Sequence, residues 1–364
     1  MKRSLNTLLI ISVLTTAPYI VLCQSDRDQS IKDSLVKVNV AFQQGVDADK
    51  AYNEGVRFFE QKLFDDAIAW FGKAIELKPS FEQAYFNRAN VKYEKKDYTG
   101  ALSDYEKAIE MNQSNDKYYY SRGKVKYELT DYDSAMADFE QSKKLNPSNA
   151  QSWYYAGLIN FEKGDFTKSV EDYSAAINIK PDYPYAFNDR GSAKRELGDS
   201  VGALADYEKA AQLSPDLAFV HNNIGSMKRK LKRPNEAILS YSIAVSKDPK
   251  YAIAWNNMGN VKFEMGDFKG AGDDFSAAIR IDTLYVYAYN NRGYALYKQK
   301  KYKEALMDLN KAVELDSLYG YAFLNRGIVK EMLRDLNGAC TDWEKASRLG
   351  VNNGKIYFEQ ECKK

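Results

Sequence analysis

The sequence predicts an all-α solenoid of nine stacked helix-turn-helix units, each 34 residues long. Glycine recurs every 34 residues from Gly123 to Gly327, and other small residues follow the same period. Each unit also holds two stretches with the apolar periodicity of helices, separated by a turn signal such as Gly164-Asp165. No insertion or deletion interrupts the period, so a repeat architecture accounts for residues 48–353.

The columns of this repeat have a physical explanation. We number positions 1 to 34 within each unit, so that position 8 is the glycine column and Ala89 fills its vacant slot. Positions 20 and 27 are alanine or serine, and position 24 is aromatic in every unit except the one with Leu309. Small side chains let the two helices of a unit approach closely, and the aromatic ring fills the space beside them. The units span residues 48–81, 82–115, 116–149, 150–183, 184–217, 218–251, 252–285, 286–319 and 320–353.

A single hairpin of this kind cannot bury its own apolar face, so neighbouring units must stack. Proline at position 32 of five units ends the second helix, because it cannot continue the hydrogen-bonded turn. Residues 354–364 are expected to form a C-terminal helix that covers the exposed face of the last unit.

These columns resemble the tetratricopeptide repeat family throughout residues 48–353. The resemblance implies a right-handed superhelix whose concave side is lined by the first helix of each unit. It also implies that the chain binds a protein or an extended peptide in this groove and acts as a scaffold or adaptor.

The N-terminus has the pattern of a secretory signal peptide over residues 1–23. Lys2 and Arg3 precede an apolar stretch from Leu8 to Leu22, and a polar run follows. The stretch is short for a membrane span, and Pro18 weakens it further as one. We therefore expect an exported mature chain that has no transmembrane span and is periplasmic, envelope-associated or secreted.

The residues around the predicted cleavage site leave two alternatives. Cleavage after Cys23 is favoured over lipid attachment to Cys23, because Leu22 is larger than the residue that normally precedes a lipid-modified cysteine. Residues 24–47 are polar with loosely spaced apolar side chains, and are expected to be a linker or a weak N-terminal helix.

Composition argues against several classes of function. The 52 Lys and Arg residues balance 50 Asp and Glu residues, so no net field gathers nucleic acid. The chain has one histidine and three cysteines, without the spacing of a metal site. His221 is at position 4, a slot that holds Tyr85, Trp153 or Trp255 in other units, which indicates packing. We expect a non-enzymatic protein that needs no metal or cofactor.

One pair of columns varies together. Position 7 is arginine in five units, and position 23 is aspartate in the same five. An ion pair that joins the two helices of a hairpin explains this, and guanidinium geometry suits it. The expected pairs are Arg88–Asp104, Arg122–Asp138, Arg190–Asp206, Arg292–Asp308 and Arg326–Asp342.

Position 6 is the candidate binding column, because its amides can match a peptide backbone unit. The column resembles the asparagine ladder by which the repeats of O-linked GlcNAc transferases hold extended peptide. The alternative is that asparagine is simply common at this position in the family. At about 1 kcal/mol per hydrogen bond the amides alone would not hold a ligand, so apolar side chains at position 2 from the fifth unit onward must contribute. The candidate groove residues are Asn53, Asn87, Asn223, Asn257, Asn291 and Asn325.

Two other binding modes are distinguishable from this one. A clamp for C-terminal carboxylates, as found in this family, needs lysine at position 5, and no unit has a basic residue there. The 28 tyrosines leave a cell-surface glycan- or nutrient-binding protein as the alternative function. A glycan site should gather aromatic and acidic side chains at one spot, whereas a peptide groove should extend along many units.

A disulfide is expected at the C-terminus. Export places the chain where disulfides persist, and removal of Cys23 leaves only Cys340 and Cys362. Cys340 is at position 21, an apolar column that should pack against the following helix, which here is the cap carrying Cys362. The bond would close a loop of about 22 residues and contribute about 3 kcal/mol in the chain-entropy model. Strict continuation of the repeat would instead turn Cys362 towards the groove.

Overall fold

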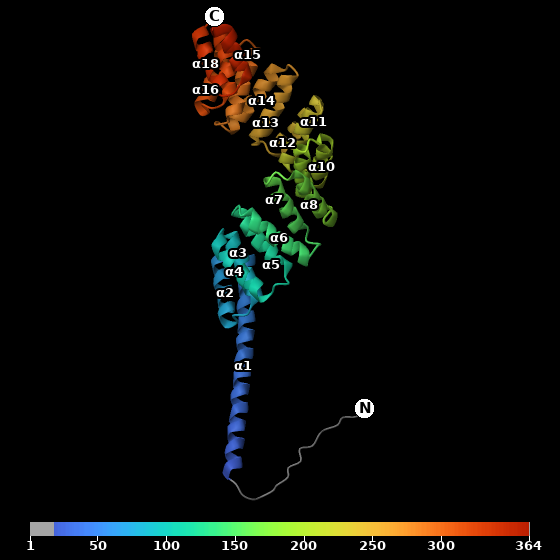
Figure 1. Cartoon of the computed structure of the whole chain (residues 1–364), viewed down its shortest axis with the longest axis vertical. Helices are drawn as coiled ribbons and strands as arrows, with labels where there is room; N and C mark the ends of the chain where they lie inside the picture. Colours follow the sequence, from blue (N-terminus) through green and yellow to red (C-terminus); the bar gives the residue numbers. More distant parts are fainter. Residues whose placement is uncertain (1–17, 364) are drawn as a thin grey trace. The chain divides into compact units, whose positions relative to one another are not determined.

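The computed structural model describes residues 18–363, and it describes side chains from residue 29 onward. This part of the chain is helical and contains no β-strand. It divides into two compact units, one ending at Leu145 and the other beginning at Asn146 (Figure 1). Most of the expected signal segment, residues 1–17, lies outside the described residues.

The first unit contains three helical hairpins. Each hairpin pairs consecutive helices, and the hairpins stack in chain order. Its helices are α1 (Pro18–Glu60), α2 (Phe64–Leu77), α3 (Glu82–Glu94), α4 (Tyr98–Met111), α5 (Asp116–Glu128) and α6 (Tyr132–Leu145).

The second unit contains six hairpins followed by a short C-terminal helix and a π-helical turn. The expected all-α repeat fold is therefore confirmed in both units. Its elements are α7 (Ala150–Glu162), α8 (Phe166–Ile179), α9 (Pro184–Glu196), α10 (Ser200–Leu213), α11 (Ala218–Lys230), α12 (Pro234–Lys247), α13 (Ala252–Glu264), α14 (Phe268–Ile281), α15 (Val286–Lys298), α16 (Tyr302–Leu315), α17 (Gly320–Met332), α18 (Leu336–Arg348), α19 (Asn352–Tyr357) and η1 (Phe358–Cys362).

The turn inside each hairpin has the same backbone in all nine repeats. The residue at position 15 has a positive φ, as in Gly164 (77°) and Thr130 (60°). Glycine adopts this conformation without the steric cost that a β-branched residue such as Thr130 meets. The next residue is an aspartate in most repeats, and its side chain caps the second helix, as Asp97 does by accepting from the backbone N–H of Gly100.

The columns of small residues form the contact between the two helices of a hairpin. A Cβ atom added at Gly55 would lie 2.6 Å from Cδ1 of Phe71, and one added at Gly225 would lie 2.7 Å from Cε1 of Tyr241. The side chains at position 24, aromatic in all repeats but the one with Leu309, are themselves buried in every repeat, and so are the small residues at position 20. Glycine at position 8 therefore makes room for the ring that fills each hairpin.

Helix α1 is much longer than the other helices of its unit. Its C-terminal part forms the first helix of the first hairpin, and the preceding part extends away from the other helices of the unit (Figure 1). Residues 24–47, expected as a linker or a weak helix, lie within this one helix. Side chains 29–44 are all exposed, including apolar ones such as Leu35 and Phe42.

The first helices of successive repeats approach one another directly. In the second unit such contacts join α7 to α9, α11 to α13, α13 to α15 and α15 to α17, and in the first unit α1 to α3 and α3 to α5. This is the packing expected when the first helices line the inner side of a curved stack. We therefore treat the free face of these helices as the groove.

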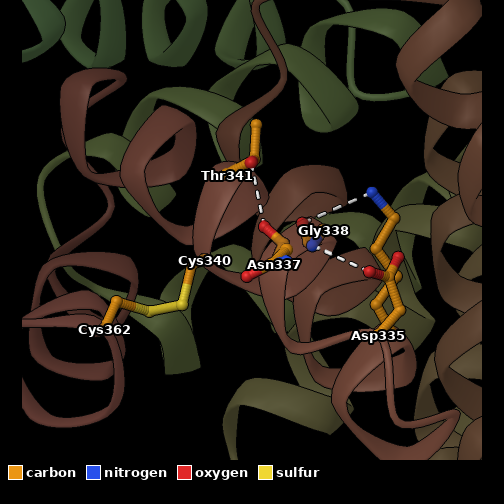
Figure 2. Close-up of a disulfide and its surroundings, with 7 residues drawn as sticks. Asp335, Asn337, Gly338, Cys340, Thr341 and Cys362 are labelled. Atoms are coloured by element: carbon orange, nitrogen blue, oxygen red, sulfur yellow. Dashed lines mark hydrogen bonds between the residues drawn. A yellow bond between two sulfur atoms is a disulfide. The ribbon is translucent and has the colours of Figure 1, made fainter.

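The C-terminal cap is tied to the last hairpin by a disulfide. Sγ of Cys340, on α18, is bonded to Sγ of Cys362, in η1, with 5.7 Å between the two Cα atoms (Figure 2). Phe358 and Cys362 also pack against the apolar cluster around Trp343. A helix as short as α19 is not stable alone, so it depends on this packing and on the covalent link.

Peptide mapping of the purified protein tests this bond. Tryptic digestion without reduction should yield residues 335–345 joined to residues 356–363 through Cys340 and Cys362. The two peptides should separate after reduction. Recovery of both peptides with free thiols from unreduced protein would contradict the assignment.

Candidate binding surface

The expected Arg–Asp pairs are confirmed in all five repeats. In each, the arginine donates through Nε and Nη2 to the two carboxylate oxygens of the aspartate, at distances of 2.6 to 2.9 Å. The aspartates are buried and the arginines half-buried. These two-pronged bonds join the two helices of one hairpin, so they contribute to the fold and leave these arginines engaged within it.

A second cation, which the sequence reasoning missed, contacts four of these aspartates and also Asp274 of the seventh repeat. Lysine at position 11 lies 2.7 to 2.8 Å from the Oδ2 atom in five repeats. Position 11 is one helical turn after position 7, so both side chains reach the same carboxylate. The signal was available, because position 11 is lysine in six of the nine repeats. The pairs are Lys92–Asp104, Lys126–Asp138, Lys194–Asp206, Lys262–Asp274 and Lys330–Asp342.

The seventh repeat shows what happens when the arginine is missing. Met258 occupies position 7, and Asp274 is left with Lys262 alone. Burial raises the pKa of Asp274 above its usual value, and the nearby lysine only partly offsets this. The folded protein thus holds this proton more tightly than the unfolded chain does. Asp274 therefore adds stability as pH falls through its raised pKa, and weakens the fold when ionised at neutral pH.

The asparagines of position 6 are hydrogen-bonded to the preceding repeat. In the second unit each donates from Nδ2 to Oδ1 of a buried asparagine at position 5 of the repeat before it, at 2.9 to 3.0 Å. We call this series the ladder. Its bonds are Asn223 to Asn188, Asn257 to Asn222, Asn291 to Asn256 and Asn325 to Asn290.

The first unit contains one bond of the same geometry. Asn87 donates from Nδ2 to the hydroxyl of Tyr52 at 2.7 Å, again from position 6 to position 5 of the preceding repeat. Asn53 has no preceding repeat and is exposed. It lines a cavity of about 700 Å³ together with Trp70 and Leu77.

The ladder leaves only part of the asparagine column able to bind a ligand. Asn291 uses both its amide and its carbonyl oxygen within the protein, and Asn325 is buried. Within the described part of the chain, Asn223 and Asn257 each make one side-chain hydrogen bond. Each retains one N–H and one oxygen at a half-buried surface. Those groups, with exposed Asn53 and the half-buried Asn87 of the first unit, are the amides that can meet a peptide backbone.

An apolar row runs beside the ladder, at position 2 of the repeats in the second unit. Positions 2 and 6 are one helical turn apart and share a face of the first helix. Tyr185, Ile253, Tyr287 and Tyr321 are 48%, 48%, 53% and 57% exposed. Phe219 is half-buried, and its ring stacks against Tyr185 with centroids 6.2 Å apart. We call these five residues the apolar row.

His221 has the structural role that its column predicts. Its Nε2 atom lies 2.9 Å from the carbonyl oxygen of Pro215. Trp255 makes the same contact from Nε1 to the carbonyl of Pro249, at 3.3 Å. These side chains at position 4 therefore hydrogen-bond to the loop that follows the second helix of the preceding repeat.

The described residues contain no group of three or more His, Cys, Asp or Glu side chains that could hold a metal ion. Among the helices described, none combines the length and apolar character needed to cross a bilayer.

The stacked hairpins, linked by the ladder, define a helical-repeat protein. Family models described as TPR repeat and Tetratricopeptide repeat match the sequence in this register and together cover more than half of it. The chain belongs to the tetratricopeptide repeat family, whose members generally mediate protein–protein interactions. The matches span residues 55–96, 89–130, 157–198 and 259–300, then 286–317, then 116–149.

Solved structures share the fold at low sequence identity. A chain of the APC/C hetero-tetramer Cut9–Hcn1 has a TM-score of 0.55 at 14% identity, covering 86% of this chain and 76% of its own. A tetratricopeptide repeat protein from Parabacteroides merdae scores 0.54 at 18% identity, with coverages of 68% and 98%. PilF of Pseudomonas aeruginosa scores 0.52 at 19%, with coverages of 58% and 95%. No curated protein sequence is a significant match.

Met258→Arg should stabilise the protein by completing the pair that the seventh repeat lacks. Arg190 and Arg292 each donate from Nη1 to a serine of the preceding repeat, and Ser242 occupies the equivalent place beside Met258, with Oγ 3.4 Å from Sδ. An arginine at 258 would therefore meet both Ser242 and Asp274. We expect about 1 kcal/mol of added stability at pH 7, measured by chemical denaturation.

The pH dependence provides the control for this substitution. The new guanidinium should lower the pKa of Asp274, so the gain should shrink as pH falls towards about 4, where the carboxylate is protonated. Met258→Leu, which adds no cation, should show neither effect. A loss of stability at pH 7 with Met258→Arg, or an equal gain at both pH values, would contradict this account.

Proposed function

We propose that the protein is an exported, non-enzymatic scaffold that binds an extended peptide or a protein segment along the groove of its second unit. The apolar row is the single observation that carries this proposal. Large apolar or aromatic side chains repeat at position 2 of five successive repeats. Four of them are exposed and Phe219 is half-buried, whereas the side chains at position 24 are buried. A regular exposed row of this kind suits a ligand that extends along the repeats.

The proposed binding requires both hydrogen bonds from the asparagine amides and burial of the apolar row. The remaining amides of Asn223 and Asn257 offer about 1 kcal/mol per hydrogen bond, whereas ordering a peptide backbone costs about 1–2 kcal/mol per residue. Burying the exposed half of a large side chain such as Ile253 contributes about 1 kcal/mol, and the row has five such side chains. The apolar row therefore supplies most of the proposed affinity, and the amides fix the direction and register of the peptide.

Export is supported by the C-terminal disulfide and by the N-terminal signal pattern. The Cys340–Cys362 bond is of a kind that persists in oxidising compartments and is rare in the cytosol. We propose cleavage after Cys23 and release to the periplasm, the envelope or the medium. Lipid attachment at Cys23 is the alternative, and intact mass of the mature protein distinguishes the two.

Glycan binding is the second candidate, and one observation favours it. Tyr154, Tyr183 and Asp189 lie together in the second unit, with the two ring centroids 4.9 Å apart and the Tyr154 hydroxyl 2.6 Å from the carboxylate. A sugar site requires such aromatic and acidic side chains at one place. The apolar row, in contrast, extends over five repeats, which a compact sugar site does not need.

The ladder determines which residues should be changed to test peptide binding. Alanine at Asn223, Asn257, Asn291 or Asn325 would remove the donor from a buried asparagine, at a cost of about 1–3 kcal/mol each. Loss of binding would then be confounded by loss of structure. The apolar row suits the test better, because none of its side chains forms a bond of the ladder and four of the five are exposed.

Replacing Tyr185, Phe219, Tyr287 and Tyr321 together by serine should weaken binding more than tenfold. The probe is a peptide selected by the wild-type protein from a phage-displayed random library, with affinity measured by titration calorimetry. The matched control replaces Val201, Leu239 and Met307, which are exposed on second helices, by serine. Both variants should keep the helical circular dichroism of the wild type. Equal affinity of the groove variant and the wild type would overturn the proposal, and so would equal losses in both variants.

A further inference from the structure

Asp189 is the one carboxylate in the position-6 column. Other repeats carry asparagine, serine or tyrosine there, and Asp189 stands between Tyr155 of the preceding repeat and Asn223 of the next. It lies on α9, one helical turn after Tyr185 of the apolar row, so both side chains share the groove face. Position 6 therefore carries a carboxylate in this repeat, whereas the other repeats have neutral side chains there.

The bonds that Asp189 makes within the protein come from neutral donors. The Tyr154 hydroxyl donates to Oδ2 at 2.6 Å, and Nδ2 of Asn188 donates to Oδ1 at 2.9 Å. Burial raises the pKa of Asp189. Within the described part of the chain, no Lys or Arg forms an ion pair with this carboxylate.

The cations of the same elements are engaged elsewhere. Arg190 binds Asp206 and Ser174. Arg195 binds Glu196 through Nε and Nη2, at 3.1 and 2.8 Å. Lys180 lies over the ring of Tyr183, 5.0 Å from its centroid. The groove thus contains a half-buried negative charge that no described cation compensates.

The ladder does not require a carboxylate at this place. In the first unit a tyrosine at position 5, Tyr52, forms the same bond with an asparagine at position 6, Asn87. An asparagine at 189 could likewise pair with Tyr154, without the cost of burying a charge. A carboxylate at a half-buried position where a neutral amide would serve points to a role beyond packing.

Tyr154, whose hydroxyl donates to the carboxylate, packs against two further tyrosine rings. The Tyr154 ring lies 4.9 Å from that of Tyr183 and 5.8 Å from that of Tyr155, centroid to centroid, and the last pair is edge-on. The faces and hydroxyls of such rings attract cations, and guanidinium and ammonium groups bind beside them. A carboxylate among tyrosines offers a cationic group both charge neutralisation and ring contact.

We propose that Asp189, with Tyr154, Tyr155 and Tyr183, is the recognition site for a lysine or arginine side chain of a peptide bound in the groove. This rests on the proposed peptide-binding function and deepens it by specifying one side chain of the ligand. The neighbouring Tyr185 then contacts an apolar residue of the same peptide. A neutral sugar would satisfy hydrogen bonds here but would leave the charge of Asp189 uncompensated, so the geometry points to a cation.

Selection from the random peptide library tests the proposal in the full-length protein. Asp189→Asn keeps an amide able to pair with Tyr154 and removes the charge, while Asp182→Asn removes an exposed charge from the loop just before α9. Peptides selected by the wild type and by Asp182→Asn should be enriched in Lys and Arg. Peptides selected by Asp189→Asn should show no such enrichment.

Affinity measurements on one selected peptide complete the test. Replacing its basic residue by citrulline, which keeps the shape of arginine without its charge, should weaken binding to the wild type at least tenfold and leave binding to Asp189→Asn unchanged. Asp189→Asn should also be at least as heat-stable as the wild type, so a lost preference cannot be due to unfolding. A basic preference that survives in Asp189→Asn, or is absent from the wild type, overturns the proposal.

The two proposals fail in distinguishable ways. If the apolar-row variant loses affinity but citrulline has no effect on the wild type, peptide binding stands and the cation site falls. If a panel of neutral oligosaccharides binds the wild type and not Asp189→Asn, while basic peptides bind neither, the cluster is a glycan site and the cation proposal falls.

Discussion

The hydrogen bond from position 6 of one repeat to position 5 of the repeat before it links the stacking of the hairpins to the shape of the groove. In the second unit this bond recurs across four successive interfaces between asparagines, and the position-5 partner is buried each time. A buried amide without its hydrogen-bond partner costs about 1–3 kcal/mol. Each bond therefore fixes the position of one first helix along the first helix of the preceding repeat. Because the apolar row lies one helical turn away, the same bond sets the spacing at which it is presented.

Two sets of polar contacts stabilise the stack, one within each hairpin and one between neighbouring hairpins. The position-23 aspartates, held by arginine and lysine, join the two helices inside a hairpin, while the ladder joins one hairpin to the next. Neither set involves position 2 of the first helix. That position can therefore vary between repeats without loss of the fold, and from Tyr185 onward it carries the apolar row that the proposed function uses.

The position of Asp189 follows from a change along the stack. Position 5 is aromatic up to Tyr154 and asparagine from Asn188 to Asn290, so the ladder changes its chemistry at this point. Asp189 accepts from both Tyr154 and Asn188, the last member of one series and the first of the other. The carboxylate thus lies, within the second unit, between Tyr154 and the first asparagine of the ladder. This combination of ring, carboxylate and adjoining apolar row distinguishes the proposed cation site from the rest of the groove.

Much of this architecture could be predicted from the sequence, because a repeat acts as its own alignment. The period located the hairpins, and the joint variation of positions 7 and 23 identified Arg88–Asp104 and its equivalents. The ladder could not be recognised in the same way. Its partners, such as Asn222 and Asn257, are separated by 35 residues, so comparison of equal positions places them in different columns. The sequence predicts the position-6 asparagines only as candidate peptide-binding residues, whereas the structure pairs four of them with position-5 asparagines. The length of α1 was also not predictable, because its exposed part packs on nothing in its unit that would leave a periodic signature.

A double-mutant cycle on Asn222 and Asn257 tests the ladder most directly. The free energy of unfolding would be measured for the wild type, Asn222→Ala, Asn257→Ala and the double variant by chemical denaturation. The bond from Nδ2 of Asn257 to Oδ1 of Asn222 predicts a coupling energy of about 1 kcal/mol, because the second substitution costs little once the first has removed its partner. Strictly additive losses would show that the two side chains do not act together, and would contradict the ladder as the link between stacking and groove.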